Sequence, residues 1–257
     1  MAVMAIVNQK GGVGKTTTTQ NLGHALVEQG QHVLLVDLDP QASLTLCCSL
    51  KPDELGRSVY DPITAAIRLD AHPTLTEVIV RTTFGADLAP ANDDLSGAEP
   101  DLYSAAGGEL IIKQVIEPLR HSYDYILIDC PPNLGLLTVN ALTAADTTLI
   151  PIQADYLPMK GVGQLLKTVT VIQRRLNPSL SIAGLLLTMA DRTLISREVI
   201  DTTRHTFEGR LPVFQTVIRR RVELRESPRS GKTVLTYASA SDAATDYREL
   251  AKEVMHA

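Results

Sequence analysis

The chain has 257 residues, of which 44% are hydrophobic, and its formal net charge is −5. This length is typical of one α/β domain with a large core. The negative net charge excludes a protein that is basic over its whole surface, but it is compatible with a local basic patch. The three cysteines include no C-x-x-C pair, so neither a disulfide framework nor a zinc site is predicted.

The sequence contains neither a predicted membrane span nor a predicted signal peptide. No apolar run approaches the roughly 18 residues that a membrane span needs, and Lys10 with the glycines after it interrupts the apolar stretch near the start, where a signal peptide would lie. We therefore expect a single domain over residues 1–257 that is cytoplasmic and does not enter a membrane.

A glycine-rich stretch near the start carries the strongest motif. It lies between an apolar run over 3–7 and a helical run over 16–29, and reads Lys10-Gly11-Gly12-Val13-Gly14-Lys15-Thr16-Thr17. A strand, a glycine-rich turn and a helix together form a phosphate cradle, because backbone N–H groups point inward and the helix N-terminus carries partial positive charge. The predicted ligand is a nucleoside triphosphate, bound by these eight residues.

The loop departs from the usual pattern G-x-x-x-x-G-K-[ST]. Gln9 stands at the position of the first glycine, and a second lysine, Lys10, follows it. This form resembles the deviant Walker A loop of the ParA/MinD class of ATPases. The resemblance implies that Lys10 reaches across a dimer interface to the nucleotide of the partner subunit, while Lys15 holds the β- and γ-phosphates and Thr16 the metal.

Two predicted strands end in carboxylates. The run over 33–36 leads into Asp37-Leu38-Asp39-Pro40-Gln41, and ligands of open α/β sheets bind beyond such strand ends. The sequence also matches switch I of ParA-type proteins. This resemblance implies that Asp39 orients or activates water and is one of the residues at the metal, with Thr16 and Asp129, and that Asp37 makes a supporting contact.

The second of these strands covers 125–128 and closes on Asp129-Cys130-Pro131-Pro132. Four apolar residues before one carboxylate resemble a Walker B strand, in which the carboxylate, here Asp129, holds Mg²⁺. The continuation is similar to switch II of the ParA family. We interpret Cys130 as a packing residue, since an iron–sulfur role, as in the related nitrogenase iron proteins, would require a second suitably placed cysteine.

The remaining elements are predicted from hydrophobic periodicity. Residues 43–81 give no clear pattern. Asp155 replaces a glutamate that is common in the family, and its role is left open. Thr188 and Met189 are adenine contacts by resemblance alone. The expected elements are strands over 87–92, 147–151 and 182–188, and helices over 109–119, 133–145, 161–175 and 242–255.

A basic segment follows near the end of the chain. It contains six basic residues against the acids Glu223 and Glu226, namely Arg219, Arg220, Arg221, Arg225, Arg229 and Lys232. A basic patch on an acidic protein is typical of local polyanion binding, and ParA-type ATPases bind DNA without sequence preference through this part of the chain. Glu223 stands where the family usually has an arginine, and a solvated turn in which the arginines pair with Glu223 and Glu226 is the alternative interpretation.

Together these features predict a doubly wound α/β P-loop NTPase with a mostly parallel sheet, and they resemble the small ParA/Soj type of partition ATPase over nearly the whole chain. The resemblance implies ATP and Mg²⁺ as cofactors, a homodimer that forms on ATP binding, non-specific DNA binding on the nucleoid, slow intrinsic hydrolysis and a ParB-like activator. Two alternatives stay open. One is a MinD-like membrane-associated regulator, although 242–255 lacks a basic amphipathic tail, and the other is a cargo-positioning switch.

Overall fold

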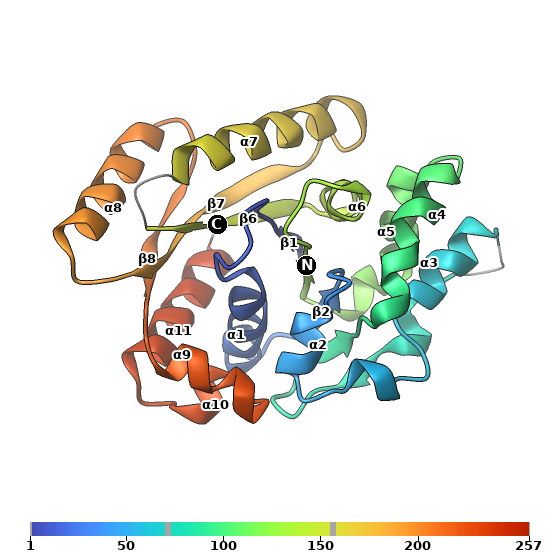
Figure 1. Cartoon of the computed structure of the whole chain (residues 1–257), viewed down its shortest axis with the longest axis horizontal. Helices are drawn as coiled ribbons and strands as arrows, with labels where there is room; N and C mark the ends of the chain where they lie inside the picture. The colour runs from blue at the N-terminus through green and yellow to red at the C-terminus, as the bar shows by residue number, and fades with distance from the viewer. Residues whose placement is uncertain (1, 70–72, 155–157, 257) are drawn as a thin grey trace.

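The computed structural model describes residues 2–69, 73–154 and 158–256. Its centre is an eight-stranded sheet with the order β3-β4-β2-β5-β1-β6-β7-β8 (Figure 1). All neighbouring strands are parallel except β3, which runs antiparallel to β4 at one edge. Because successive parallel strands must be joined by crossovers, helices cover both faces. The predicted doubly wound, mostly parallel α/β fold is confirmed.

The elements have the following bounds. The strands are β1 (Ala2–Ile6), β2 (Val33–Asp37), β3 (Val80–Arg81), β4 (Asp87–Ala89), β5 (Tyr125–Asp129), β6 (Thr147–Gln153), β7 (Ser181–Ala190) and β8 (Val213–Arg219). The helices are α1 (Lys15–Glu28), α2 (Ser43–Cys47), α3 (Tyr60–Ile67), α4 (Ala98–Ser104), α5 (Ile111–Ile116), α6 (Leu136–Ala144), α7 (Pro158–Arg175), α8 (Leu194–Phe207), α9 (Glu223–Glu226), α10 (Val234–Tyr237) and α11 (Asp242–Met255).

The central strands are apolar at almost every position because both of their faces are covered. Successive side chains of a strand point to opposite faces, so β2 sends Leu34 and Val36 into one core and Val33 and Leu35 into the other. Helices α3 to α7 contribute to the first core, and α1, α2, α10 and α11 to the second. Helices α1 and α11 accordingly lie on one side of the sheet and α7 on the other (Figure 1).

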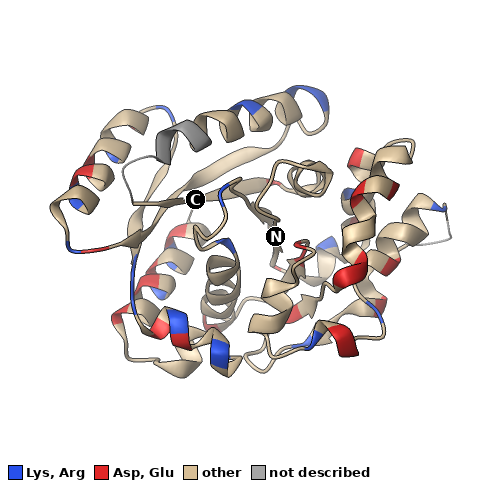
Figure 2. Ribbon diagram, in the orientation of Figure 1, with Lys and Arg blue, Asp and Glu red and all other residues tan. Residues whose placement is uncertain are grey.

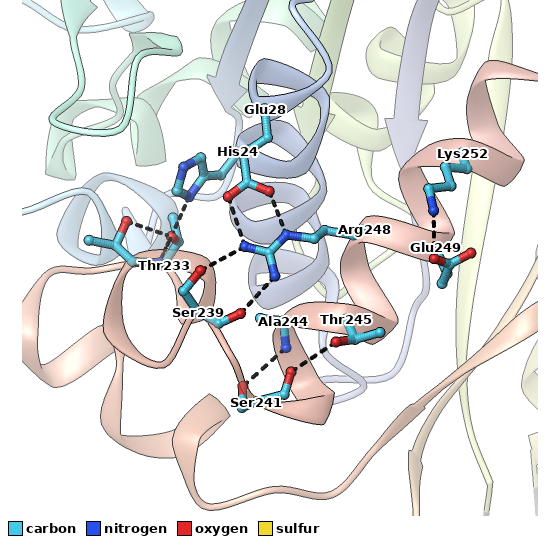
Figure 3. A network of polar contacts seen from close by, with 11 residues as sticks. His24, Glu28, Thr233, Ser239, Ser241, Ala244, Thr245, Arg248, Glu249 and Lys252 are labelled. Carbon is cyan, nitrogen blue, oxygen red and sulfur yellow. Dashed lines mark hydrogen bonds and ion pairs between the residues drawn. The ribbon is translucent and has the colours of Figure 1, made fainter.

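Helix α1 is fastened to the C-terminal part of the chain by polar contacts (Figure 3). His24 Nδ1 lies 2.5 Å from Thr233 Oγ1, and Arg248 donates from Nε and Nη2 to the Glu28 carboxylate at 2.6 and 2.9 Å. The same guanidinium donates from Nη1 to the Ser239 carbonyl at 2.7 Å. These contacts join the C-terminal half of α1, the helix that begins at the end of the phosphate loop, to the C-terminal part of the chain.

Several parts of the fold were predicted wrongly or not at all. The predicted helix over 109–119 is instead a 3-10 turn (Gly108–Leu110), the short α5 and a second 3-10 turn (Glu117–Ser122), because Pro118 has no N–H to continue an α-helix. Helix α8 and strand β8 were not predicted at all. Asp155, whose role was left open, lies outside the described residues.

Candidate nucleotide site

Three neighbouring strands bring the predicted motifs to one edge of the sheet. Strand β5 lies between β1 and β2, and the pairing register places Asp37 directly opposite Asp129 and Asp129 opposite Ile6. The phosphate loop starts just beyond Ile6. Segments that are about 30 and 120 residues apart in the sequence therefore meet at the carboxyl ends of adjacent parallel strands, where open α/β sheets bind their ligands.

The phosphate loop owes its shape to two glycines and one asparagine. Gly12 and Gly14 have φ angles of 72° and 87°, in the left-handed region that favours glycine. Asn8 supports the turn from inside, since its Oδ1 accepts the Lys10 N–H at 2.9 Å and its Nδ2 donates to the Pro151 carbonyl at 2.7 Å. Gly14 is the N-cap of α1 and has no side chain to cap it. The first N–H groups of α1 are thus available to an anion.

The two lysines of the loop occupy different environments. Lys15 is buried, with its Nζ 3.5 Å from the Lys10 carbonyl oxygen. Burial lowers the pKa of Lys15, against the raising effect of the nearby carboxylates Asp129 and Asp39. Lys10 is exposed, and its Nζ donates to Gln153 Oε1 at 3.1 Å. Lys15 is therefore set inside the cradle, while Lys10 stands at its rim.

The carboxylates surround the first turn of α1. Thr16 Oγ1 donates to Asp129 Oδ2 at 2.7 Å and Thr19 Oγ1 lies 3.3 Å from Asp129 Oδ1. Asp37 accepts the N–H and the hydroxyl of Thr45 at 2.9 and 2.8 Å, and this makes it a structural contact. Asp39 Oδ1 accepts the Gln41 N–H at 3.0 Å.

This oxygen-rich set fits Mg²⁺. Burial and the neighbouring Asp37 raise the pKa of Asp129 to about 8, as expected for two buried carboxylates side by side. Among the described residues, no three Asp, Glu, His or Cys side chains are grouped so as to hold a metal. The Thr16 hydroxyl and Asp129 would thus share the ion with phosphate oxygens and water, which is the usual arrangement for Mg²⁺.

A cavity of about 510 Å³ opens beside the phosphate loop, at the ends of β7 and β8. Thr188 and Met189 line it, and Thr188 Oγ1 donates to the Val13 carbonyl at 2.8 Å. Met189 has a φ angle of 54°, which is rare for a residue with a side chain. The other residues around the cavity are Gly14, Thr17, Ile218, Arg219, Arg220, Arg221, Leu224, Arg225 and Tyr247.

Comparison with known proteins agrees with this geometry. Residues 1–182 match the family described as an AAA domain. The chain is 44% identical to the sporulation initiation inhibitor protein Soj of Bacillus subtilis, over 98% of this chain and 97% of that protein. It is 39% identical to the chromosome partitioning protein ParA of Myxococcus xanthus, over 98% and 87%. The chain belongs to the ParA/Soj family.

A solved structure is similar to this chain in both sequence and fold. The cobyrinic acid a,c-diamide synthase of Mycobacterium smegmatis, crystallised with ADP and magnesium, shares 40% identity with this chain and a TM-score of 0.85, covering 100% of this chain and 94% of that one. In the part of this ParA/Soj-family chain that the structure describes, no helix is long and apolar enough to cross a membrane.

The basic segment of this ParA/Soj-family chain divides into two groups. Arg219, Arg220, Arg221 and Arg225 line the cavity beside the phosphate loop, whereas Arg229 and Lys232 lie beyond it, on a 3-10 turn (Pro228–Ser230) and just before α10. Figure 2 shows basic residues from the end of β8 through α9, with acidic residues of α11 close by. Five of the six basic residues are exposed, and Arg221 is partly buried.

Three residues that the structure places at the site were not predicted to belong to it. Asn8 braces the loop, Gln153 holds Lys10, and Tyr247 of α11 forms part of the cavity wall. Asn8 and Gln153 are polar residues at the ends of apolar strand runs, the same signal that identified Asp37 and Asp129. Tyr247 gave no signal, because it lies on the apolar face of a C-terminal helix.

The buried carboxylates make the stability of the nucleotide-free protein depend on pH. In EDTA and without nucleotide, we expect the free energy of unfolding to fall as the pH rises from 6.5 to 8, by at most about 1.4 kcal/mol per pH unit for one proton. The unfolded Asp129 is ionised above 3.8 whereas the folded one keeps its proton to about 8. The folded state thus binds more protons, and raising the pH favours unfolding.

Urea unfolding at several pH values measures this effect. Asp129→Asn should flatten the curve, and Mg²⁺ with ADP should flatten it too, because an Asp129 that binds the ion is ionised in the folded as well as in the unfolded state. Burial lowers the pKa of His24, so below pH 6.5 this residue makes the free energy of unfolding increase with pH. The comparison is therefore restricted to pH 6.5 and above. A wild-type curve that rises or stays level from 6.5 to 8 would contradict the assignment.

Proposed function

We propose that this chain is an ATP-dependent DNA partition ATPase, in which an ATP-bound homodimer binds DNA without sequence preference and hydrolysis releases it. Membership of the ParA/Soj family supports the partition role, and the phosphate loop with its neighbouring carboxylates supports ATP hydrolysis with Mg²⁺. The observation that carries the proposal is the doubled lysine of the loop, one buried in the cradle and one exposed at its rim.

Each residue of the loop has a distinct task in this proposal. The N–H groups of residues 11–17 bind the phosphates, Lys15 neutralises the β- and γ-phosphates, and Thr16 and Asp129 hold Mg²⁺, which neutralises charge that develops on the phosphates. Asp39 orients the attacking water. Phosphoryl transfer depends mainly on positioning and charge neutralisation. The intrinsic rate is therefore slow until a partner, a ParB-like protein, completes the site.

In this proposal Lys10 acts in the dimer, where it binds the nucleotide of the partner subunit. In one subunit its ammonium group donates to a neutral amide of Gln153, which is a weak partner compared with a phosphate. When two subunits close face to face, Lys10 of each exchanges this contact for the triphosphate of the other. Dimer formation is thereby tied to ATP rather than to ADP, which lacks the γ-phosphate.

The basic segment supplies the DNA surface. Arg229 and Lys232 are exposed and lie outside the cavity wall, so they are available to DNA phosphates whether or not a nucleotide is bound. Arg219, Arg220, Arg221 and Arg225 extend this surface from the cavity rim. Because contacts to phosphates carry no sequence information, binding is non-specific and weakens as salt rises.

DNA co-sedimentation with ATP, ADP or no nucleotide tests the proposal. Retention with ATP alone, decreasing with salt, is the expected result. Arg229→Gln combined with Lys232→Gln should weaken retention equally for unrelated DNA sequences and reduce its salt dependence. Equal DNA binding in all three nucleotide states would overturn the proposal, and ATP-dependent binding to anionic vesicles in place of DNA would favour the MinD-like alternative.

A further inference from the structure

The short helix α2 lies between two residues with an unfavourable backbone conformation. Ala42, its N-cap, has a φ angle of 49°, and Ser49, which follows its C-cap, has a φ angle of 65°. Left-handed conformations cost free energy in residues that carry a side chain, and they cluster where a chain switches between states. The two residues therefore mark α2 as a short rigid piece between two bends.

The first bend is connected to the nucleotide site. The Ala42 N–H donates to the Asp39 carbonyl at 2.8 Å, so the residue that is proposed to orient water lies directly before α2. Within α2, Thr45 donates its N–H and its hydroxyl to the carboxylate of Asp37, which lies opposite Asp129 in the sheet. A shift of these carboxylates on nucleotide binding would therefore act directly on α2.

The second bend lies against the basic segment. Ser49 Oγ donates to the Gly231 carbonyl at 2.9 Å. Gly231 has a φ angle of 60°, and a Cβ at this position would lie 1.7 Å from Ser49 Oγ, so the approach depends on glycine. Gly231 belongs to the basic turn, residues 228–232, which also contains the exposed Arg229 and Lys232. The end of α2 thus touches the turn that is proposed to contact DNA.

The other side of the basic turn is bonded to α1. The Val234 N–H donates to Asn21 Oδ1 at 2.7 Å, and Asn21 Nδ2 donates to the Thr17 carbonyl at 2.7 Å, at the end of the phosphate loop. Thr233 makes a second contact with α1 (Figure 3). Lys232 therefore lies between one anchor on α1 and one at the end of α2, and its position depends on where α2 lies relative to α1.

We propose that α2 couples the nucleotide site to the DNA surface, with Ser49 as the residue that positions the basic turn. The inference rests on the proposed function and adds to it a connection within one subunit. With ATP bound, the contacts of Asp39 at the γ-phosphate side hold α2 where the basic turn fits DNA. The coupling is reciprocal, so DNA strengthens ATP binding by the same factor.

DNA binding by the full chain tests this inference. Fluorescence anisotropy measures the affinity for a labelled duplex with Mg²⁺ and a non-hydrolysable ATP analogue, and again without nucleotide. Low salt keeps the residual binding measurable. We expect Ser49→Ala to lower the affinity with the analogue by about fivefold, the effect of losing one hydrogen bond, and to leave the nucleotide-free affinity unchanged.

A matched serine variant is the control. Ser104→Ala, on α4, removes a hydroxyl that donates to the Asp101 carbonyl over the same distance, 2.9 Å. Ser49 and Ser104 are both exposed. Ser104→Ala should leave both DNA affinities unchanged.

A pair of variants tests the contact itself. Gly231→Ala places a Cβ against Ser49 Oγ and should weaken DNA binding with the analogue more than Ser49→Ala does. Adding Ser49→Gly removes the obstructing side chain and suits the left-handed backbone at this position. The double variant should therefore recover most of the loss. Ser49→Gly alone gives the same test as Ser49→Ala if Gly231→Ala does not fold.

A reciprocal measurement separates coupling from simple support of the fold. Without DNA, Ser49→Ala should bind the analogue and dimerise as the wild type does. The increase in analogue affinity that DNA causes should shrink by the same factor as the increase in DNA affinity that the analogue causes. A loss of stability alone would not make these two factors equal.

The possible failures are distinct. If the wild type binds DNA equally with and without the analogue, the proposed function fails. If the wild type shows the dependence and Ser49→Ala retains it in full, the inference fails and the proposed function stands. The inference is also overturned if Ser49→Ala weakens DNA binding by the same factor in both states, because Ser49 would then only support the turn.

Discussion

Asp39→Ala is expected to lower the rate of ATP hydrolysis by about 10²–10⁴-fold, the usual contribution of a positioned acid–base group, while ATP binding persists. Asp39 lies at the carboxyl end of β2, outside the Thr16–Asp129 pair, and one of its oxygens accepts the Gln41 N–H. Its removal leaves the phosphate loop and the Thr16–Asp129 hydrogen bond in place. Phosphate release under single-turnover conditions measures the effect.

The same variant should accumulate as a dimer. Because hydrolysis resets the dimer in our proposal, a subunit pair that cannot hydrolyse ATP stays closed and retains DNA, which light scattering and co-sedimentation would show. Asp53→Ala removes an exposed carboxylate from another part of the chain and serves as the control. If Asp39→Ala hydrolyses ATP at the wild-type rate, Asp39 has been given the wrong role.

Lys10→Ala is expected to abolish ATP-dependent dimerisation while each subunit still binds ATP. A hydrogen bond between charged groups contributes about 1.5–3 kcal/mol. A symmetric dimer loses two of them, about 3–6 kcal/mol, which weakens the dimer by more than about a hundredfold. The Lys10 side chain is exposed, and its ammonium group donates a hydrogen bond to the Gln153 side chain, so the loss of this side chain should not disturb the fold. Sedimentation velocity with ATP and with ADP measures the effect.

Gln153→Ala is the matched control for this experiment. It removes the partner that holds Lys10 in the single subunit but keeps the lysine, so the ATP-bound dimer should be at least as stable as that of the wild type. A stable ATP dimer of Lys10→Ala would show that the two subunits associate through another surface, and the proposed switch would then fail.

The sequence predicted the elements that have strong local patterns. Helix α11 has the predicted bounds, 242–255, because its apolar residues recur with helical spacing and Ser241 caps its first turn. Strands β2 and β5 were found as short apolar runs that end in aspartates. Strand β8 was missed because its side chains are only partly buried along one edge of the sheet, so it has no continuous apolar run.

The candidate site, too, was predicted only where short stretches of sequence carry a pattern. The pattern over 10–17 and the carboxylates after two buried strands can be recognised from short stretches, because the chemistry of phosphate binding imposes them on consecutive residues. The contact between Lys10 and Gln153 could not be recognised, since it joins residues 143 positions apart. The basic segment was recognised as basic, but its division between the cavity rim and the outer surface was not.

The amino acid order alone determined the phosphate loop, the two strand-end aspartates and the alternation of strands and helices, since each depends on backbone rules that act within a few residues. Only the tertiary structure decided which distant segments share the nucleotide site. The order of strands places β7 and β8 at one side of the phosphate loop, and with them the arginines that line the cavity beside the loop. That order results from how whole layers bury their apolar faces, which no short stretch of sequence records.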